Sequence, residues 1–169
     1  MLIRMTDGLE AGVDEAGRGA LAGPVVAAAI IFPAGYENAA IQDSKVISAE
    51  DREILRNELL DTALCWSVGM MSVSEIDRQN ILQATFSAMH EAIAGLVITP
   101  EILLIDGNRF RPYPNLPHHC IIKGDANYLS IAAASILAKT FRDDVMKLLD
   151  AEMPEYGWAT NKGYPTKAH

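Results

Sequence analysis

The 169-residue chain contains few cysteines and no long uninterrupted apolar segment. Cys65 and Cys120 are too few for a disulfide framework and lack the spacing of metal ligands, so we expect both to be reduced and buried. No apolar run reaches the roughly 18 residues that a membrane-spanning helix requires. The N-terminus also lacks the charged-then-apolar pattern of a signal peptide. These absences predict a cytoplasmic protein with no membrane partner.

Positive charge is also in short supply. Lysine and arginine number 14 against 22 aspartates and glutamates, which gives a formal net charge of −8. Binding to nucleic acid usually needs a basic surface, so this balance argues against such a partner. Two arrangements would remove the objection: carboxylates clustered to bind divalent cations, or cations gathered on one face.

The remaining composition is that of a globular protein of one domain, with 50% hydrophobic and 21% charged residues. Apolar β-branched runs predict strands, and a 3.6-residue apolar period predicts helices. We expect strands at 11–15, 24–32, 65–73, 101–106 and 118–123, and helices over 48–63, from a Ser74 cap to about 93, and over about 127–152. The tail from residue 156 has no period and is expected to be loop. This order predicts an α/β fold in which the first two strands form an antiparallel hairpin of a mixed sheet.

Four carboxylates follow predicted strands. Asp14 and Glu15 end the first strand in "GVDEAGRGALAGP", Asp106 ends the fourth in "LLIDGN", and Asp125 follows the fifth in "IIKGDAN". If the first and fourth strands are neighbours, all four converge at the strand ends, where sites form in open α/β sheets. Side chains alternate along a strand, so Asp14 and Glu15 share a site only if the strand bends or ends between them. Such a cluster needs a counter-charge, and oxygen ligands favour Mg²⁺ or Mn²⁺.

The turn "GRGALAG" differs from the dinucleotide-binding fingerprint, because its third glycine comes one residue late and Pro24 opens a strand rather than a helix. One interpretation is that Gly17 and Gly19 let the backbone approach a ligand closely while Arg18 meets a phosphate. The alternative is a hairpin turn in which the glycines only supply positive φ. The spacing does not separate the two.

Four blocks, "GVDEAGRGALAGPVVAAAII", "DSKVIS", "LLIDGN" and "KGDANYLSIAAASILAKTFRD", together resemble ribonuclease HII, the type 2 ribonuclease H. The resemblance runs from about Gly12 to the last residue. It implies the ribonuclease-H-like mixed five-stranded sheet flanked by helices. It also implies that the four acids bind metal, that Gly17, Arg18 and Gly19 read a ribose 2′-hydroxyl, and that Tyr164 stacks on the sugar. Four further residues are candidate substrate contacts by their positions: Lys45, Lys123, Asn161 and Lys162.

The resemblance implies an endonuclease that cuts on the 5′ side of a ribonucleotide in RNA/DNA hybrids or in duplex DNA, leaving 3′-hydroxyl and 5′-phosphate ends. Two Mg²⁺ or Mn²⁺ ions would activate water and stabilise the leaving oxygen. We expect a monomer. Members of the family usually continue past the "KGY" block, so we expect residues 1–169 to be a single catalytic domain without the family's C-terminal helical segment.

Two other classes remain open. A junction resolvase or transposase-type nuclease would share the fold, but neither acts on a 2′-hydroxyl, which the Gly-Arg-Gly turn and Tyr164 are suited to contact. A non-catalytic nucleic-acid-binding domain would have no reason to keep four acids whose clustering is electrostatically costly. Metal-dependent cleavage distinguishes the enzymes from the binding domain, and dependence on a ribose distinguishes the two enzymes.

Overall fold

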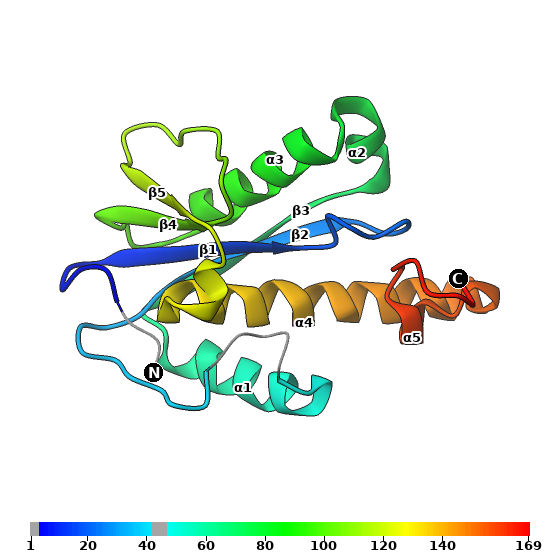
Figure 1. The fold of residues 1–169 in the computed structure, drawn as a ribbon, viewed down its shortest axis with the longest axis horizontal. Helices are drawn as coiled ribbons and strands as arrows, with labels where there is room; N and C mark the ends of the chain where they lie inside the picture. The colour runs from blue at the N-terminus through cyan, green and yellow to red at the C-terminus, as the bar shows by residue number, and fades with distance from the viewer. Residues whose placement is uncertain (1–3, 42–46) are drawn as a thin grey trace.

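A mixed five-stranded sheet lies between two helical layers (Figure 1). The computed structural model describes residues 4–41 and 47–169, so the candidate Lys45 lies outside the described residues. The strands are β1 (Glu10–Ala16), β2 (Val25–Ile31), β3 (Cys65–Met71), β4 (Ile102–Asp106) and β5 (His118–Ile121), in the order β3-β2-β1-β4-β5. β1 and β2 form the expected antiparallel hairpin, whereas β4 and β5 extend the sheet in parallel. The five expected strands and the mixed sheet are thus confirmed.

The helices cover the two faces of the sheet separately. α4 (Leu129–Glu152) packs on β1 and β2, and α1 (Ala49–Thr62) packs on α4. α3 (Ile81–Ala94) covers the opposite face over β2 and β3, and α2 (Val73–Gln79) precedes it. Central strands β1 and β2 are buried on both faces, and β2 accordingly consists only of valine, alanine and isoleucine.

One glycine sets the distance between α4 and the sheet. A Cβ on Gly12 in β1 would lie 2.0 Å from the backbone carbonyl carbon of Ser130 in α4. No side chain fits in that space. The close packing places the length of α4 directly along β1, and with it the residues of both elements that surround the site.

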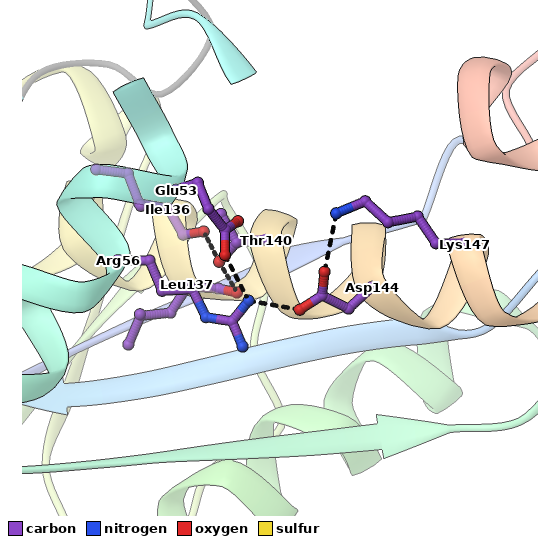
Figure 2. Close-up of polar contacts among 7 residues, drawn as sticks. All are labelled: Glu53, Arg56, Ile136, Leu137, Thr140, Asp144 and Lys147. Carbon is purple, nitrogen blue, oxygen red and sulfur yellow. Dashed lines mark hydrogen bonds and ion pairs between the residues drawn. The ribbon is translucent and has the colours of Figure 1, made fainter. Parts of the chain in front are cut away.

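An arginine connects α1 to α4 (Figure 2). Arg56 donates to Asp144 Oδ2 at 2.5 Å, and its guanidinium lies 4.0 Å from the centroid of the Phe141 ring. Lys147 donates to the other oxygen of Asp144 at 3.1 Å. These contacts lie on the side of α4 that faces α1.

Three local expectations were wrong. The helix expected from Ser74 to about residue 93 is two helices separated at Asn80, whose φ of 69° ends α2 and whose side chain caps α3. The first of them is capped by Ser72, which forms a capping box with Glu75, and not by Ser74. The tail is not all loop, since it contains the short helices η2 (Pro154–Tyr156) and α5 (Trp158–Asn161).

Both cysteines are free, as expected, but only Cys65 is buried, and Cys120 on β5 is partly exposed. Within residues 4–41 and 47–169, no helix has both the length and the apolar character needed to cross a membrane.

Candidate active site

Asp14 and Asp106 lie at the same level on two neighbouring parallel strands. The register pairs Val13 of β1 with Ile105 of β4, and the two aspartates are the next residue on each strand. The condition for convergence of the acids, that the first and fourth strands be neighbours, is therefore met. Asp14 is only 4% exposed, although it carries an ionisable group.

Glu15 reaches the same edge of the sheet, and of the two expected routes, a bend or an end of the strand, the structure excludes the second. β1 continues to Ala16, so the strand does not end between Asp14 and Glu15. The backbone N–H of Glu15 donates a 2.7 Å hydrogen bond to Asp14 Oδ1, and the carboxyl of Glu15 also interacts with Asp106. Three acids from two strands therefore share one electrostatic environment.

That environment disfavours their ionised forms. Burial raises the pKa of Asp14 well above its ordinary value of 3.8, and the negative charges of Glu15 and Asp106 raise it further. The Ser135 hydroxyl on α4 acts in the opposite direction. Burial likewise raises the pKa of Glu15, while Arg18 lowers it and Asp106 raises it. The crevice is therefore short of positive charge.

Asp125 enters from the segment that joins β5 to α4. It lies in the short helix η1 (Gly124–Ala126) and is only 1% exposed. The preceding residue fixes η1 to β4, since the N–H of Gly124 donates to Asp106 Oδ1 at 2.8 Å. Lys123 begins this turn in the left-handed conformation with φ of 56°, and its side chain is exposed.

The donor set fits a hard divalent cation. All four candidate ligands offer carboxylate oxygens, which Mg²⁺ and Mn²⁺ prefer. A bound cation would supply the positive charge that stabilises the ionised forms of Asp14 and Glu15. Over the described part of the chain, no group of three or more acidic, histidine or cysteine side chains is already placed to hold a metal ion. The structure therefore gives Asp14, Glu15 and Asp106 a shared electrostatic environment without a preformed metal site.

The Gly-Arg-Gly turn follows directly from these acids. Gly17 has φ of 99°, and a Cβ there would lie 2.2 Å from Arg142 Nε, so this position requires glycine for the fold. Gly19 differs, because its φ is not positive and a Cβ there would meet nothing within 4 Å. Arg18 donates to Glu15 Oε1 at 3.4 Å, and its side chain is 49% exposed. The interpretation that the glycines only supply positive φ therefore holds for Gly17 but does not explain Gly19.

The tail lies at the same end of α4 as this turn (Figure 1). Tyr164 is 38% exposed, with its ring centroid 5.3 Å from the Arg142 guanidinium. Asn161 makes hydrogen bonds within the tail, donating to the Tyr156 carbonyl at 2.7 Å and accepting from the N–H of Gly163 at 2.8 Å. These bonds shape the loop that carries Tyr164.

A pocket of about 340 Å³ opens between the tail, α1 and α4. Its lining includes Tyr164 and Ala16, the residue that follows Glu15 at the end of β1. Four basic side chains line it, Arg52, Lys139, Arg142 and Lys162, together with the acidic Asp143. Cations are thus gathered around this pocket, despite the net charge of −8.

Arg142 is a residue that the sequence reasoning missed. It is 1% exposed and donates to the backbone carbonyls of Ala22 and Pro24, in the connection from β1 to β2, and of Lys162 in the tail. The sequence did contain a sign of its burial, because Arg142 lies four residues from both Ala138 and Met146 on the buried side of α4. An arginine on an apolar helix stripe is costly unless its donors are satisfied.

A buried acidic crevice at the ends of parallel strands, on this mixed sheet with helices on both faces, defines the ribonuclease-H-like class of proteins. A sequence model described as Ribonuclease HII matches residues 11–169. The chain is 57% identical over 164 residues to a ribonuclease HII of Parabacteroides distasonis, covering 97% of this chain and 82% of that protein. It is 57% identical over 161 residues to one from Bacteroides fragilis, covering 95% and 80%.

Solved structures agree. The ribonuclease H2 of Pyrococcus horikoshii superposes with a TM-score of 0.81 at 27% identity, covering 94% of this chain and 82% of that one. The ribonuclease HII of Archaeoglobus fulgidus, solved as a complex with PCNA, gives 0.75 at 26% identity, covering 94% and 83%. A Bst-RNase HIII solved with Mn²⁺ gives 0.72 at 20% identity, which shows a shared fold. The chain belongs to the ribonuclease HII family and is an endoribonuclease.

Proposed function

We propose that this protein hydrolyses the phosphodiester on the 5′ side of a ribonucleotide, in RNA/DNA hybrids or in duplex DNA with embedded ribonucleotides. The products would carry 3′-hydroxyl and 5′-phosphate ends. The observation that supports this most directly is the mutual interaction of Asp14, Glu15 and Asp106 at the strand ends, immediately before a turn in which Gly19 is open to solvent.

Asp14, Glu15, Asp106 and Asp125 would hold two divalent cations, Mg²⁺ or Mn²⁺. When bound, such ions lower the pKa of an attacking water and stabilise the charge of the leaving 3′-oxygen. The role of the four carboxylates is to hold and orient oxygen ligands around the scissile phosphate. Their partial burial removes competing water and strengthens each electrostatic contact.

The turn and the tail would select the ribonucleotide. The 2′-hydroxyl is the group that distinguishes ribose from deoxyribose at such a site. Gly17 gives the turn its positive φ, and at exposed Gly19 no side chain covers the backbone, so amide and carbonyl groups there can contact that hydroxyl. Half-exposed Arg18 can approach a phosphate. Partly exposed Tyr164 presents an aromatic ring for stacking on the sugar.

Basic residues beside the crevice would bind the flanking phosphates. Lys162 lines the pocket next to Tyr164, and exposed Lys123 precedes the η1 segment that carries Asp125. Asn161 would act by shaping the tail loop. Lys45, the monomeric state and the cytoplasmic location stay predictions from the sequence.

The test is cleavage of an end-labelled DNA duplex with one ribonucleotide, compared with the all-deoxy duplex, in Mg²⁺, in Mn²⁺ and in EDTA. We expect one cut 5′ to the ribonucleotide, abolished by EDTA and by Asp14→Asn. Asp144→Asn is the matched control, because this aspartate lies on the α1 side of α4 in a salt bridge with Arg56 (Figure 2). Cleavage of both duplexes would overturn the ribose specificity. Cleavage that persists in EDTA or in Asp14→Asn would overturn the metal mechanism.

A further inference from the structure

Arg142 joins two segments that are far apart in the sequence. Its Nε donates to the carbonyl of Pro24 at 2.9 Å and its Nη2 to that of Ala22 at 2.9 Å, both in the connection between β1 and β2. Its Nη1 donates to the carbonyl of Lys162 in the tail at 2.7 Å. All three nitrogens of the guanidinium therefore bind backbone oxygens, and one rigid side chain links the turn and the tail to α4.

The turn and the tail also contact each other directly. The N–H of Leu21 donates to the carbonyl of Gly163 at 2.8 Å. A Cβ on Gly163 would lie 2.3 Å from the Ala22 carbonyl oxygen, so the two backbones leave no space for a side chain. The ring of Tyr164 follows immediately and lies over the Arg142 guanidinium.

We propose that Arg142 is a positioning residue for ribonucleotide recognition: it holds the Gly17–Gly19 turn and Tyr164 in one fixed relation, so that both contact the same nucleotide. This inference rests on the proposed function, in which the turn reads the 2′-hydroxyl and Tyr164 stacks on the sugar. Only arginine can serve here, because the planar fork offers donors in fixed directions, whereas a lysine ammonium would meet fewer of the three carbonyls.

An arginine that only fills the core would behave differently. Its replacement would lower stability, but the contribution of Tyr164 to substrate selection would stay the same in the remaining folded protein. If Arg142 acts through the turn and the tail, then the effects of replacing Arg142 and Tyr164 must be coupled. A double-mutant cycle measures this coupling.

The cycle compares wild type, Arg142→Lys, Tyr164→Ala and the double variant, with kcat/KM measured on the duplex with one ribonucleotide. We expect Arg142→Lys to lower kcat/KM by about 100-fold, the size of effect that a misplacement of about 1 Å can cause. Tyr164→Ala should lower it strongly in the wild type but only a few-fold further in the Arg142→Lys background. Independent, multiplicative losses would overturn the proposal.

Arg56→Lys is the matched control, because Arg56 also combines a carboxylate partner with an aromatic ring but contacts neither the turn nor the tail. It should leave kcat/KM unchanged. If Arg142→Lys does not fold, Gly163→Ala replaces it in the cycle, since its Cβ would push the tail from the Ala22 carbonyl without altering Arg142. It should show the same coupling to Tyr164.

Amide hydrogen exchange tests whether Arg142 holds the turn to the tail without a measurement of activity. In Arg142→Lys, or in Gly163→Ala, the Leu21 amide should exchange at least about tenfold faster, because its acceptor is Gly163, while the Ala28 amide in central β2 should be unaffected. Unchanged exchange at Leu21 would overturn the link. If the wild type cleaves neither duplex, the proposed function fails together with the recognition role, and Leu21 exchange still decides whether Arg142 holds the turn to the tail.

Discussion

The backbone N–H of Gly124 donates a 2.8 Å hydrogen bond to Oδ1 of Asp106. This bond joins the end of β4 to the η1 segment, so the strand that carries Asp106 also determines where Asp125 stands. The fold thereby assembles its acids in pairs: Asp14 with Glu15 on β1, and Asp106 with the segment of Asp125. The parallel pairing of β1 and β4 brings the two pairs to the same edge of the sheet.

Asp106→Asn tests the charge of this arrangement while keeping its shape. An asparagine oxygen can still accept from Gly124, so we expect a folded protein, but the loss of a negative ligand should reduce cleavage by at least about 100-fold. Removal of this charge should also lower the pKa of Asp14 and of Glu15, because Asp106 raises both. Carboxyl carbon NMR titration measures these values. Unchanged titration of both groups would contradict the shared electrostatic environment.

The stability of the metal-free protein should fall as pH rises through the titration of Asp14. Its pKa in the folded state is raised above the ordinary 3.8, mainly by burial, so the folded state binds the proton more tightly than the unfolded state. Stability is then lost between about pH 4 and the raised folded pKa. Asp14→Asn removes this loss, so it should raise the melting temperature more at pH 7.5 than at pH 4.5.

Asp144→Asn provides a control of opposite sign. Although burial opposes the shift, hydrogen bonds from Arg56 and Lys147 lower the pKa of Asp144 below 3.8. Its contribution to stability is present above the unfolded pKa and is lost as pH falls through the folded value. This substitution should therefore lower the melting temperature at pH 7.5 and have less effect in acid. The same pH trend in both variants would contradict the assignment.

Divalent cations should stabilise the protein against heat. Binding to the folded state alone adds about 2.7 kcal/mol when the ion is at 100 times its dissociation constant. We expect Mn²⁺ or Mg²⁺ to raise the melting temperature of the wild type at pH 7.5, and to have little effect on Asp14→Asn or Asp106→Asn. Sodium chloride at matched ionic strength controls for screening. An equal shift in all three proteins would show that the ions bind elsewhere.

The strands, the long helices and the candidate acids could be predicted from the sequence because their signals are local. The strands of this protein are short apolar runs bounded by glycine, proline or acids, and the long helices have a clear apolar period, so both are local signals. Asp14, Asp106 and Asp125 could be predicted to lie near one another because each lies near the C-terminal end of a strand, and these ends meet at one edge of a parallel pair. The parallel pairing of β1 and β4 confirmed this condition for Asp14 and Asp106.

The features that were missed depend on longer-range or single-residue effects. The break at Asn80 needs only one residue with φ of 69°, which leaves the apolar period on either side almost intact. The role of Arg142 depends on carbonyls about 20 and 120 residues away in the sequence, and no local pattern encodes them. These hydrogen bonds of Arg142 can be recognised only once the packing of α4 along β1 is known.

Substitution by alanine should lower the stability of the protein at Gly17 but not at Gly19. At Gly17 the positive φ and the contact with Arg142 make a Cβ unfavourable, so Gly17→Ala should lower the free energy of unfolding by about 1–3 kcal/mol or more. At Gly19 a Cβ meets open space, so Gly19→Ala should change stability by no more than about 0.5 kcal/mol. Urea denaturation measures both.

Cleavage activity, in contrast to stability, should be sensitive to Gly19→Ala. Because Gly19→Ala leaves the fold intact, any loss of cleavage comes from the methyl group standing between the backbone and the substrate. We expect kcat/KM on the duplex with one ribonucleotide to fall by at least about tenfold, as for an interaction of roughly 1.4 kcal/mol in the transition state. Ala20→Gly, which removes a methyl group from the next position in the turn, is the control and should keep its activity. If Gly19→Ala were as active as the wild type, the backbone at Gly19 could not be what contacts the 2′-hydroxyl, and ribose selection would fall to Gly17, Arg18 and Tyr164.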